Sequence, residues 1–176
     1  GERFVHLTRA EGLPDDQVET LYADADGAIW AGTRHGLARI QGGRVTVMTP
    51  RQGLAHERIS AVYRDRAGRL WIGTQAGLNR IESNGHTTLF TVRSGLANDF
   101  VRGLLEDRHG NLWVGTNQGL GRLSEGRWSR LGTAQGLSSN LVRSLYEDKD
   151  GSLWIGLYGA GLSRLRDGEL TSLSTR

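Results

Sequence analysis

The polar side chains that could bind a small molecule lie in short loops between apolar segments. One family of loops carries Arg34-His35, Gln75-Ala76, Asn117-Gln118 and residues 157–160, and the other carries residues 14–17, 56–58, 98–100 and 139–141. Charged groups, amides and a phenol suit a polar ligand such as a sugar. The alternative, that any one of them is an ordinary solvated loop residue, stays open. The candidate ligand-binding residues are Arg34, His35, His56, Arg58, Gln75, Asn98, Asp99, Asn117, Gln118, Asn140 and Tyr158.

Signatures of catalysis and of metal binding are weak. The chain has no Cys, which excludes disulfides, zinc–thiolate clusters and thiol nucleophiles. Its five His residues show no metal-ligand spacing, and neighbouring carboxylates such as Asp15-Asp16 point in opposite directions on an extended chain. A calcium loop needs an acid where Tyr22 and Tyr146 stand. We therefore expect no catalytic residue, no metal and no cofactor.

Charge and hydropathy narrow the classes of partner. The 22 basic residues, of which only Lys149 is not Arg, face 19 acidic ones, and the net charge of +3 is spread along the chain without a basic run. A nucleic-acid partner is not expected, because its binding surface needs clustered basic side chains. No segment approaches 18 uncharged apolar residues, and the N-terminus lacks a charged-then-apolar leader, so we expect neither a membrane span nor a signal peptide in this chain.

Internal repeats determine the expected architecture. The residues Trp30, Trp71, Trp113 and Trp154 recur at steps of 41, 42 and 41, and the Gly-Leu pairs at 12, 53, 95 and 136 keep the same steps. Each of the four copies holds four short apolar runs separated by turn residues, which is typical of strands. Gly, at 26 of 176 residues, is about twice its average frequency, as many tight turns require.

Two repeated features read as scaffold. Each first strand ends in Asp-x-x-Gly, beginning at Asp24, Asp65, Asp107 and Asp148. The Asp can accept backbone N–H bonds across such a turn while Gly supplies a positive φ, so the first two strands should form a hairpin. An Arg column at 39, 80, 122 and 164 should make hydrogen bonds within or between repeats, and each Trp should anchor its repeat in the core.

Four antiparallel strands per 41 to 42 residues is the arithmetic of a β-propeller blade. We expect an all-β fold, a single propeller segment over 1–176 with four four-stranded antiparallel blades at about 12–49, 53–91, 95–132 and 136–174, and an extra outer strand at 3–8. This surplus strand makes five outer strands for four sets of the others, so we expect part of a larger ring or half of an eight-bladed dimer. The isolated chain should then pair with a second copy or with other blades. A compact four-bladed monomer is the alternative.

The pattern Asp-x-x-Gly-x-Leu/Ile-Trp-Ile-Gly-Thr-x-x-Gly-Leu-x-Arg resembles the two-component regulator propeller repeat. The resemblance recurs four times and covers nearly the whole chain. It is not the Trp-Asp repeat, because Ala31, Ile72, Val114 and Ile155 follow the Trp residues. The resemblance implies a periplasmic sensor region of a bacterial receptor whose cytoplasmic part is a histidine kinase or diguanylate cyclase.

Three functions follow from this resemblance and from the residues. The first is a non-catalytic sensory module that binds a small polar ligand, such as a carbohydrate. The second is a scaffold propeller for protein–protein contacts, and the third is a propeller lyase or hydrolase. In propellers the two variable loop families share one face around the central channel, which places the candidate residues at the channel mouth.

Overall fold

The computed structural model describes residues 4–173, and in it each repeat folds into one four-stranded antiparallel sheet in chain order. The first strands are β1 (Val18–Ala23), β5 (Ile59–Arg64), β9 (Val101–Glu106) and β13 (Val142–Glu147), and the second are β2 (Ile29–Thr33), β6 (Leu70–Thr74), β10 (Leu112–Thr116) and β14 (Leu153–Leu157). The third are β3 (Leu37–Gln41), β7 (Gly77–Ile81), β11 (Gly119–Ser124) and β15 (Leu162–Arg166), and the fourth are β4 (Arg44–Met48), β8 (Thr87–Phe90), β12 (Arg127–Leu131) and β16 (Glu169–Leu173). These four sheets, blades 1 to 4, confirm the predicted propeller architecture.

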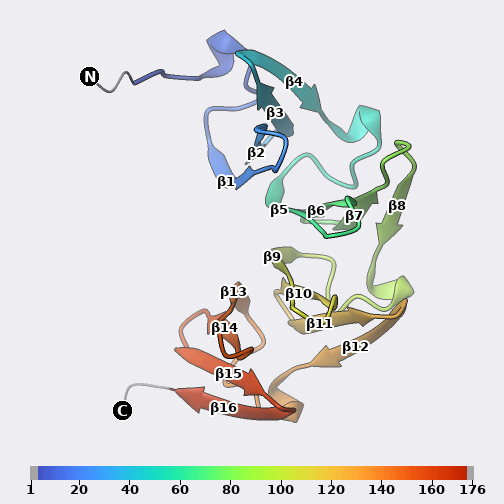
Figure 1. The fold of residues 1–176 in the computed structure, drawn as a ribbon, viewed down its shortest axis with the longest axis vertical. Coiled ribbons are helices and arrows are strands. Elements are labelled where there is room, and N and C mark those ends of the chain that lie inside the picture. The colour runs from blue at the N-terminus through green and yellow to red at the C-terminus, as the bar shows by residue number, and fades with distance from the viewer. Residues whose placement is uncertain (1–3, 174–176) are drawn as a thin grey trace.

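The blades stand side by side in an arc (Figure 1). The first strands β1, β5, β9 and β13 lie along the inside of the arc and contact one another in that order, while the fourth strands lie outside. The arc is open on the side where both chain ends lie. The inner strands therefore form the wall of a channel that is open along one side.

Each Asp-x-x-Gly turn holds the Trp of its own blade. In blades 2 to 4 one carboxylate oxygen accepts a backbone N–H across the turn, as the sequence predicted, from Arg69, Asn111 and Ser152, whereas in blade 1 it accepts from the adjacent Ala25. The other oxygen accepts the indole N–H of the Trp six residues later, at 2.7 to 2.9 Å. The Arg column lies over these indoles, 5.4 to 5.9 Å from the ring centroids, in cation–π contact. Arg39 and Arg80 also make the predicted polar contacts within their blades, to Asp26 at 2.6 Å and to Glu82 at 2.7 Å.

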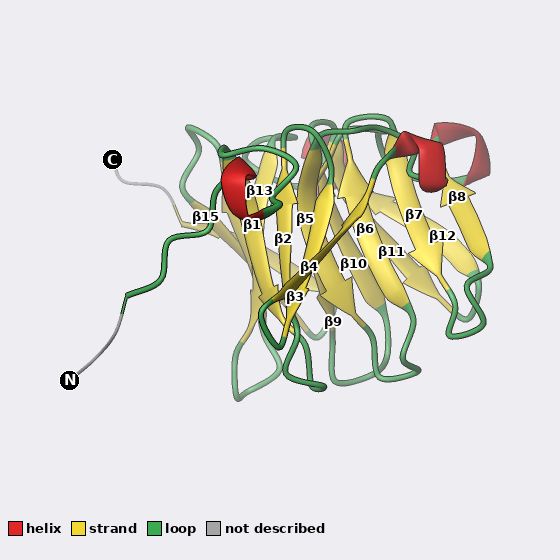
Figure 2. Ribbon diagram, turned by 90° about the horizontal axis from the view of Figure 1, so that it is seen from above, coloured by secondary structure: helices red, strands yellow, loops and turns green. Residues whose placement is uncertain are grey.

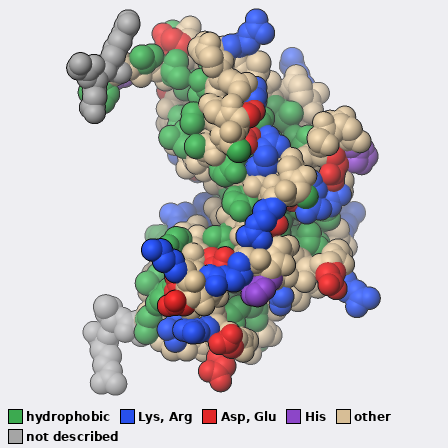
Figure 3. Space-filling model, viewed as in Figure 1, with side chains coloured by type: hydrophobic (Ala, Val, Ile, Leu, Met, Phe, Trp, Pro, Cys, Tyr) green, Lys and Arg blue, Asp and Glu red, His purple; other side chains and the backbone are tan. Residues whose placement is uncertain are grey.

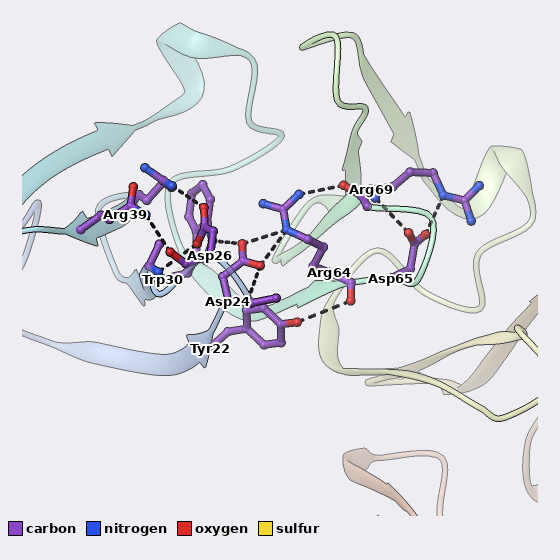
Figure 4. A network of polar contacts seen from close by, with 12 residues as sticks. Tyr22, Asp24, Asp26, Trp30, Arg39, Arg64, Asp65 and Arg69 are labelled. Carbon is purple, nitrogen blue, oxygen red and sulfur yellow. Dashed lines mark hydrogen bonds and ion pairs between the residues drawn. The ribbon is translucent and has the colours of Figure 1, made fainter.

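Consecutive blades pack Trp face against first-strand face. Between blades 1 and 2, Trp30 and Leu37 pack against Ile59 and Leu70, and the same repeat positions meet at the other two junctions. At the first junction Arg64 Nε also donates to Asp24 at 2.8 Å, and the Tyr22 hydroxyl lies 3.5 Å from the Arg64 carbonyl oxygen (Figure 4). The Trp residues at 30, 71 and 113 are buried and Trp154 is half-buried, which confirms the anchor prediction.

The segments that lead into the four blades contain short 3-10 helices that the repeats did not indicate. These are η1 (Arg9–Glu11), η2 (Pro50–Gln52), η3 (Val92–Ser94) and η4 (Thr133–Gln135). Each ends at the Gly of the Gly-Leu pair, whose φ of 100° to 111° only Gly adopts without strain. Figure 2 shows the helices along one edge of the molecule, the edge that holds the loops between second and third strands. None of the helices within 4–173 is long and apolar enough to cross a membrane.

The expected outer strand at 3–8 does not form over its described residues. Residues 4–8 adopt no regular structure, and Phe4 and Val5 are exposed; residue 3 lies outside the described residues. A fourth strand is held by its ladder to a third strand, and no strand of the described chain pairs with this segment. At the other end, β16 ends at Leu173, and residue 174 of the predicted strand also lies outside the description.

Candidate functional site

The two variable loop families share one face of the arc, as expected. The segment after the second strand donates a backbone hydrogen bond to the loop that enters the next blade in blades 2 and 3, and to the loop that enters its own blade in blade 4. Gly77 N–H donates to the Asp99 carbonyl at 2.8 Å, Gly119 N–H to the Asn140 carbonyl at 2.7 Å, and Tyr158 N–H to the Leu141 carbonyl at 2.9 Å. These bonds fix the loops against one another at the rim of the channel.

A β-bulge in every first strand turns one side chain out of the ladder. The register of β1, β5, β9 and β13 against their second strands shifts by one residue near the strand start. A bulged residue is left unpaired, and its side chain can be aimed away from the sheet faces. The bulge residues, which we call the bulge column, are Glu19, Ser60, Arg102 and Arg143.

Glu19 forms the first polar cluster on the channel wall. Its Oε1 accepts from Arg34 Nε at 3.1 Å and from Arg58 Nη2 at 2.8 Å. With the Gln75 amide turned so that its oxygen faces Arg58, that oxygen accepts from Arg58 Nε and Nη1 at 3.1 and 3.0 Å. Blades 1 and 2 thus bring three predicted ligand residues together around a carboxylate that was not predicted.

Arg102 and Arg143 form a second cluster on blades 3 and 4. Arg102 Nε donates to Asn117 Oδ1 at 2.8 Å, and its guanidinium lies 3.9 Å from the centroid of the Phe100 ring. The Arg143 guanidinium lies 5.3 Å from the centroid of the Tyr158 ring. Burial, together with the nearby positive charge of Arg143, lowers the pKa of Arg102, although the group stays protonated.

Two cavities adjoin these clusters, and both are lined by Arg102 and Arg143. One, of about 270 Å³, is completed by Asn117, Leu141 and Tyr158. The other, also of about 270 Å³, is completed by two further members of the bulge column. The space-filling view shows the molecule hollowed on the open side of the arc (Figure 3).

Other predicted site residues shape their own loops. The side chains of His56, Asn98, Asp99 and Asn140 each accept a backbone N–H bond, from Arg58, Phe100, Val92 and Thr133 respectively. His35 Nδ1 lies 2.8 Å from Asp15 Oδ2, and His35 is exposed. Gln118 contributes only its backbone N–H, to Thr116 Oγ1. These residues belong to the loop face, but the clusters on the channel wall do not include them.

The bulge column was missed although the sequence contained its signal. Departures from the repeat were sought in loops, whereas this column lies inside a strand, between an apolar position and a small residue. Its four members are Glu, Ser, Arg and Arg, whereas in every repeat the preceding residue is apolar and the following residue is small. A search for variable columns within the strands would have found it.

Two further crevices on the opposite side of the blades read as scaffold. One lies between blades 2 and 3, lined by Asp65, Trp71 and Arg80 among others, and the other lies between blades 3 and 4, lined by the same repeat positions. A crevice that recurs at these two junctions from the same repeat positions follows from blade packing. No group of three potential metal ligands occurs within residues 4–173.

Comparison with known families gives four matches along the chain. The model of the family described as "Two component regulator propeller" matches residues 12–35, 53–76, 95–118 and 136–159, together more than half of the sequence. No curated protein sequence matches the chain.

Solved structures share the fold. The extracellular domain of BT3049 from B. thetaiotaomicron, described as a hybrid two component system, is 24% identical, with a TM-score of 0.81 over 90% of this chain and 23% of its own. The extracellular domain of BT4673 from the same organism is 24% identical, with a TM-score of 0.76 over 89% of this chain and 25% of its own. Virginiamycin B lyase from Staphylococcus aureus is 20% identical, with a TM-score of 0.72 over 92% and 57%. The chain thus spans about a quarter of the length of the two extracellular domains.

Proposed function

The chain belongs to the two component regulator propeller family, and we propose that it is a non-catalytic sensory module of a bacterial receptor, acting outside the cytoplasm in the periplasm. Its role is to bind a small polar ligand, such as a carbohydrate, on the loop face and the adjoining channel wall. The fold shared with extracellular domains of receptor systems supports this location.

One observation carries the proposal. The bulge column, a strand position whose charge differs between the four repeats, lies on the inner wall together with loop residues of the variable families. Glu19 and Arg58 lie there with Arg102 and Arg143, beside two cavities. Cavities edged by charged groups, an amide and a phenol offer the few directed contacts that small-ligand sites use.

The experiment is a ligand-induced shift of the unfolding temperature. The purified chain is heated with a panel of neutral and acidic mono- and disaccharides, with Arg58→Gln as the test variant and Arg44→Gln, on the outer strand β4, as its control. A ligand should raise the Tm of the wild type and of the control, and less or not at all that of Arg58→Gln. If no compound raises the Tm, ligand sensing by this chain is wrong.

A hydrolase or lyase is the second candidate, favoured by the pair His35 and Asp15 on the loop face. Hydrogen bonds from the Gln17 backbone and from His35 lower the pKa of Asp15, so the carboxylate is charged and can orient the imidazole. The likeness to virginiamycin B lyase concerns the fold. Turnover of a panel compound that disappears in Asp15→Asn would establish this candidate, and binding without turnover would exclude it for that compound.

A further inference from the structure

The guanidiniums of Arg102 and Arg143 have no carboxylate within ion-pair distance in residues 4–173, and the one acid that lines a cavity with them, Glu19, is paired with two other arginines. Arg102 and Arg143 occupy the same repeat position on adjacent inner strands and line the same two cavities. Two like charges that line the same cavities repel each other, and an anion bound between them would relieve this repulsion.

Neighbouring side chains hold both guanidiniums beside the cavities that they share. The Phe100 ring supports one guanidinium and the Tyr158 ring the other, and Asn117 accepts from Arg102 Nε. This leaves the terminal nitrogens of both groups without a protein acceptor in the described chain. A guanidinium presents a planar set of donors that matches carboxylate, sulfate and phosphate oxygens.

We infer that Arg102 and Arg143 bind the anionic group of the ligand, which is therefore an acidic small molecule bearing a carboxylate, sulfate or phosphate. This inference rests on the proposed function, because it names the chemical class of the ligand for the same site. Asn117, whose oxygen accepts from Arg102, lines one of the cavities, and its amide NH2 group could contact the neutral part of the ligand.

Isothermal titration with a matched pair of sugars tests the inference. Glucuronate and glucose differ in charge at one carbon, and inorganic sulfate and phosphate test the anion alone. Glucuronate should bind at least about tenfold more tightly than glucose, and each of Arg102→Gln and Arg143→Gln should weaken it by about tenfold or more. Arg44→Gln, which alters an outer strand, should bind as the wild type does. Arg143 is exposed, so its variant keeps the test valid even if Arg102→Gln fails to fold.

The outcomes separate the two proposals. Equal affinity for glucuronate and glucose, or unchanged affinity in both variants, overturns the anion assignment and leaves ligand sensing in place. Failure of glucuronate, sulfate and phosphate to bind overturns it as well, and the neutral sugars of the wider panel then decide whether the proposed function survives. Binding of sulfate or phosphate without glucuronate would support the anion site and reject the acidic sugar.

A second inference comes from the end faces of the arc. On blade 1, the residues that would face a preceding blade are exposed: Val18 by 43%, Leu21 by 67% and Ile29 by 38%. Their equivalents in blades 2 to 4 pack against the blade before them. At the positions of Val18 and Ile29 these equivalents are exposed by 4% or less: Ile59, Val101, Val142, Leu70, Leu112 and Leu153.

Blade 4 exposes the face that would meet a following blade. Leu162 is 44% exposed, whereas its equivalents Leu37, Leu78 and Leu120 are fully buried, and Tyr146 is 63% exposed. The glycine of each second strand receives the side chain that begins the next blade: a Cβ on Gly73 would lie 2.5 Å from Val101 Cγ1. At Gly156 a Cβ would meet only groups of its own blade, the nearest being the side chain of Ser144.

At the three internal junctions, the first residue of a blade packs on the second-strand glycine of the blade before it. Val18 of blade 1 and Gly156 of blade 4 each lack this partner within the described chain. We propose that a second copy of this chain docks its blade 1 face on the blade 4 face of the first. Two such contacts about a twofold axis would close the eight-bladed ring and enclose the channel, whose wall is otherwise incomplete. The contact between these two faces would be more apolar than the internal junctions, because blade 1 has Ala23 where the other blades carry Arg64, Glu106 and Glu147.

Light scattering at micromolar concentration tests this contact with one variant on each face. Leu21→Glu and Tyr146→Glu alter exposed residues, so both should fold, and each alone should be monomeric because every contact uses both faces. An equimolar mixture should regain dimers through the one intact pair of faces. Leu89→Glu, an exposed position on outer strand β8, should associate as the wild type does.

Weak specific contacts between proteins associate at about 50 to 100 µM. A wild-type chain that stays monomeric at that concentration would overturn the proposed contact. A face variant that still forms full dimers would show that like faces meet, which overturns it too. Oligomers larger than a dimer would keep the contact and reject the closed ring.

Discussion

Replacing Trp71 by Ala tests the central claim about the scaffold, namely that each Trp is buried by the next blade. Trp71 is fully buried, donates its indole N–H to Asp65 at 2.7 Å, and stacks 5.6 Å from the Phe90 ring centroid. A Trp buries about 150–250 Å², which at about 25 cal/mol per Å² corresponds to roughly 4–6 kcal/mol. The denatured chain already hides part of this area, so we expect a loss of about 3–5 kcal/mol.

The assay is urea unfolding together with the thermal midpoint, in protein dilute enough to be monomeric. For a chain of this size, each kcal/mol corresponds to about 2–4 °C, so Tm should fall by roughly 6–20 °C. Trp154→Ala is the matched control, because Trp154 makes the same 2.7 Å bond to its Asp but is half-buried without a following blade. Its loss should be clearly smaller than that of Trp71→Ala. Equal losses would mean that burial between blades is not what anchors the Trp column.

Three further perturbations probe the turn, the blade junction and the rim. Hydrogen bonds from the Trp154 indole and the Ser152 backbone lower the pKa of Asp148. The stability that this carboxylate contributes is therefore complete above its unfolded pKa of about 3.9 and is lost as the pH falls through the lower pKa of the folded state. The urea midpoint of unfolding should drop below about pH 4, and this drop should be less steep in Asp148→Asn. Gly73→Ala should cost about 1–3 kcal/mol of unfolding free energy, because its Cβ would lie 2.5 Å from Cγ1 of the buried Val101. Gly156→Ala should cost less by the same urea measurement, because the group that its Cβ would meet is the hydroxyl of the exposed Ser144, which can rotate away. Gln75→Ala should change the unfolding free energy by only about 0.5 kcal/mol, and a loss above about 1 kcal/mol would show that its contact with Arg58 supports the fold.

The sequence predicted the blades well because the same physical constraints are repeated four times. In each repeat Asp and Gly define a tight turn, the Trp side chain needs a buried environment, and each short apolar run has the length of a strand. The indole bond to the Asp was not predicted, although the constant spacing of six residues between Asp24 and Trp30, kept in every repeat, was visible. The 3-10 helices were missed because three residues are too few to show a helical period.

The site was predicted less completely, for a reason of register. Loop residues such as Arg34, Arg58 and Asn117 do reach the channel wall, but the residues that organise them are bulged strand residues. A one-residue bulge leaves the apolar pattern on either side almost unchanged, so strand periodicity does not show where a side chain leaves the ladder.

The bulge column also leads to a last prediction, that the site can vary without cost to the fold. Arg143 is unpaired in the ladder and exposed, so Arg143→Ser, which installs the residue of blade 2, should change the unfolding free energy by about 0.5 kcal/mol or less. Val142, one residue earlier, is fully buried against blade 3, and Val142→Ser should cost about 2–4 kcal/mol through lost packing and a buried hydroxyl. Urea unfolding of the two variants decides between a decoupled site and a structural one. Comparable losses at the two positions would mean that Arg143 holds the blades together, and its charge would then no longer count as evidence for a ligand.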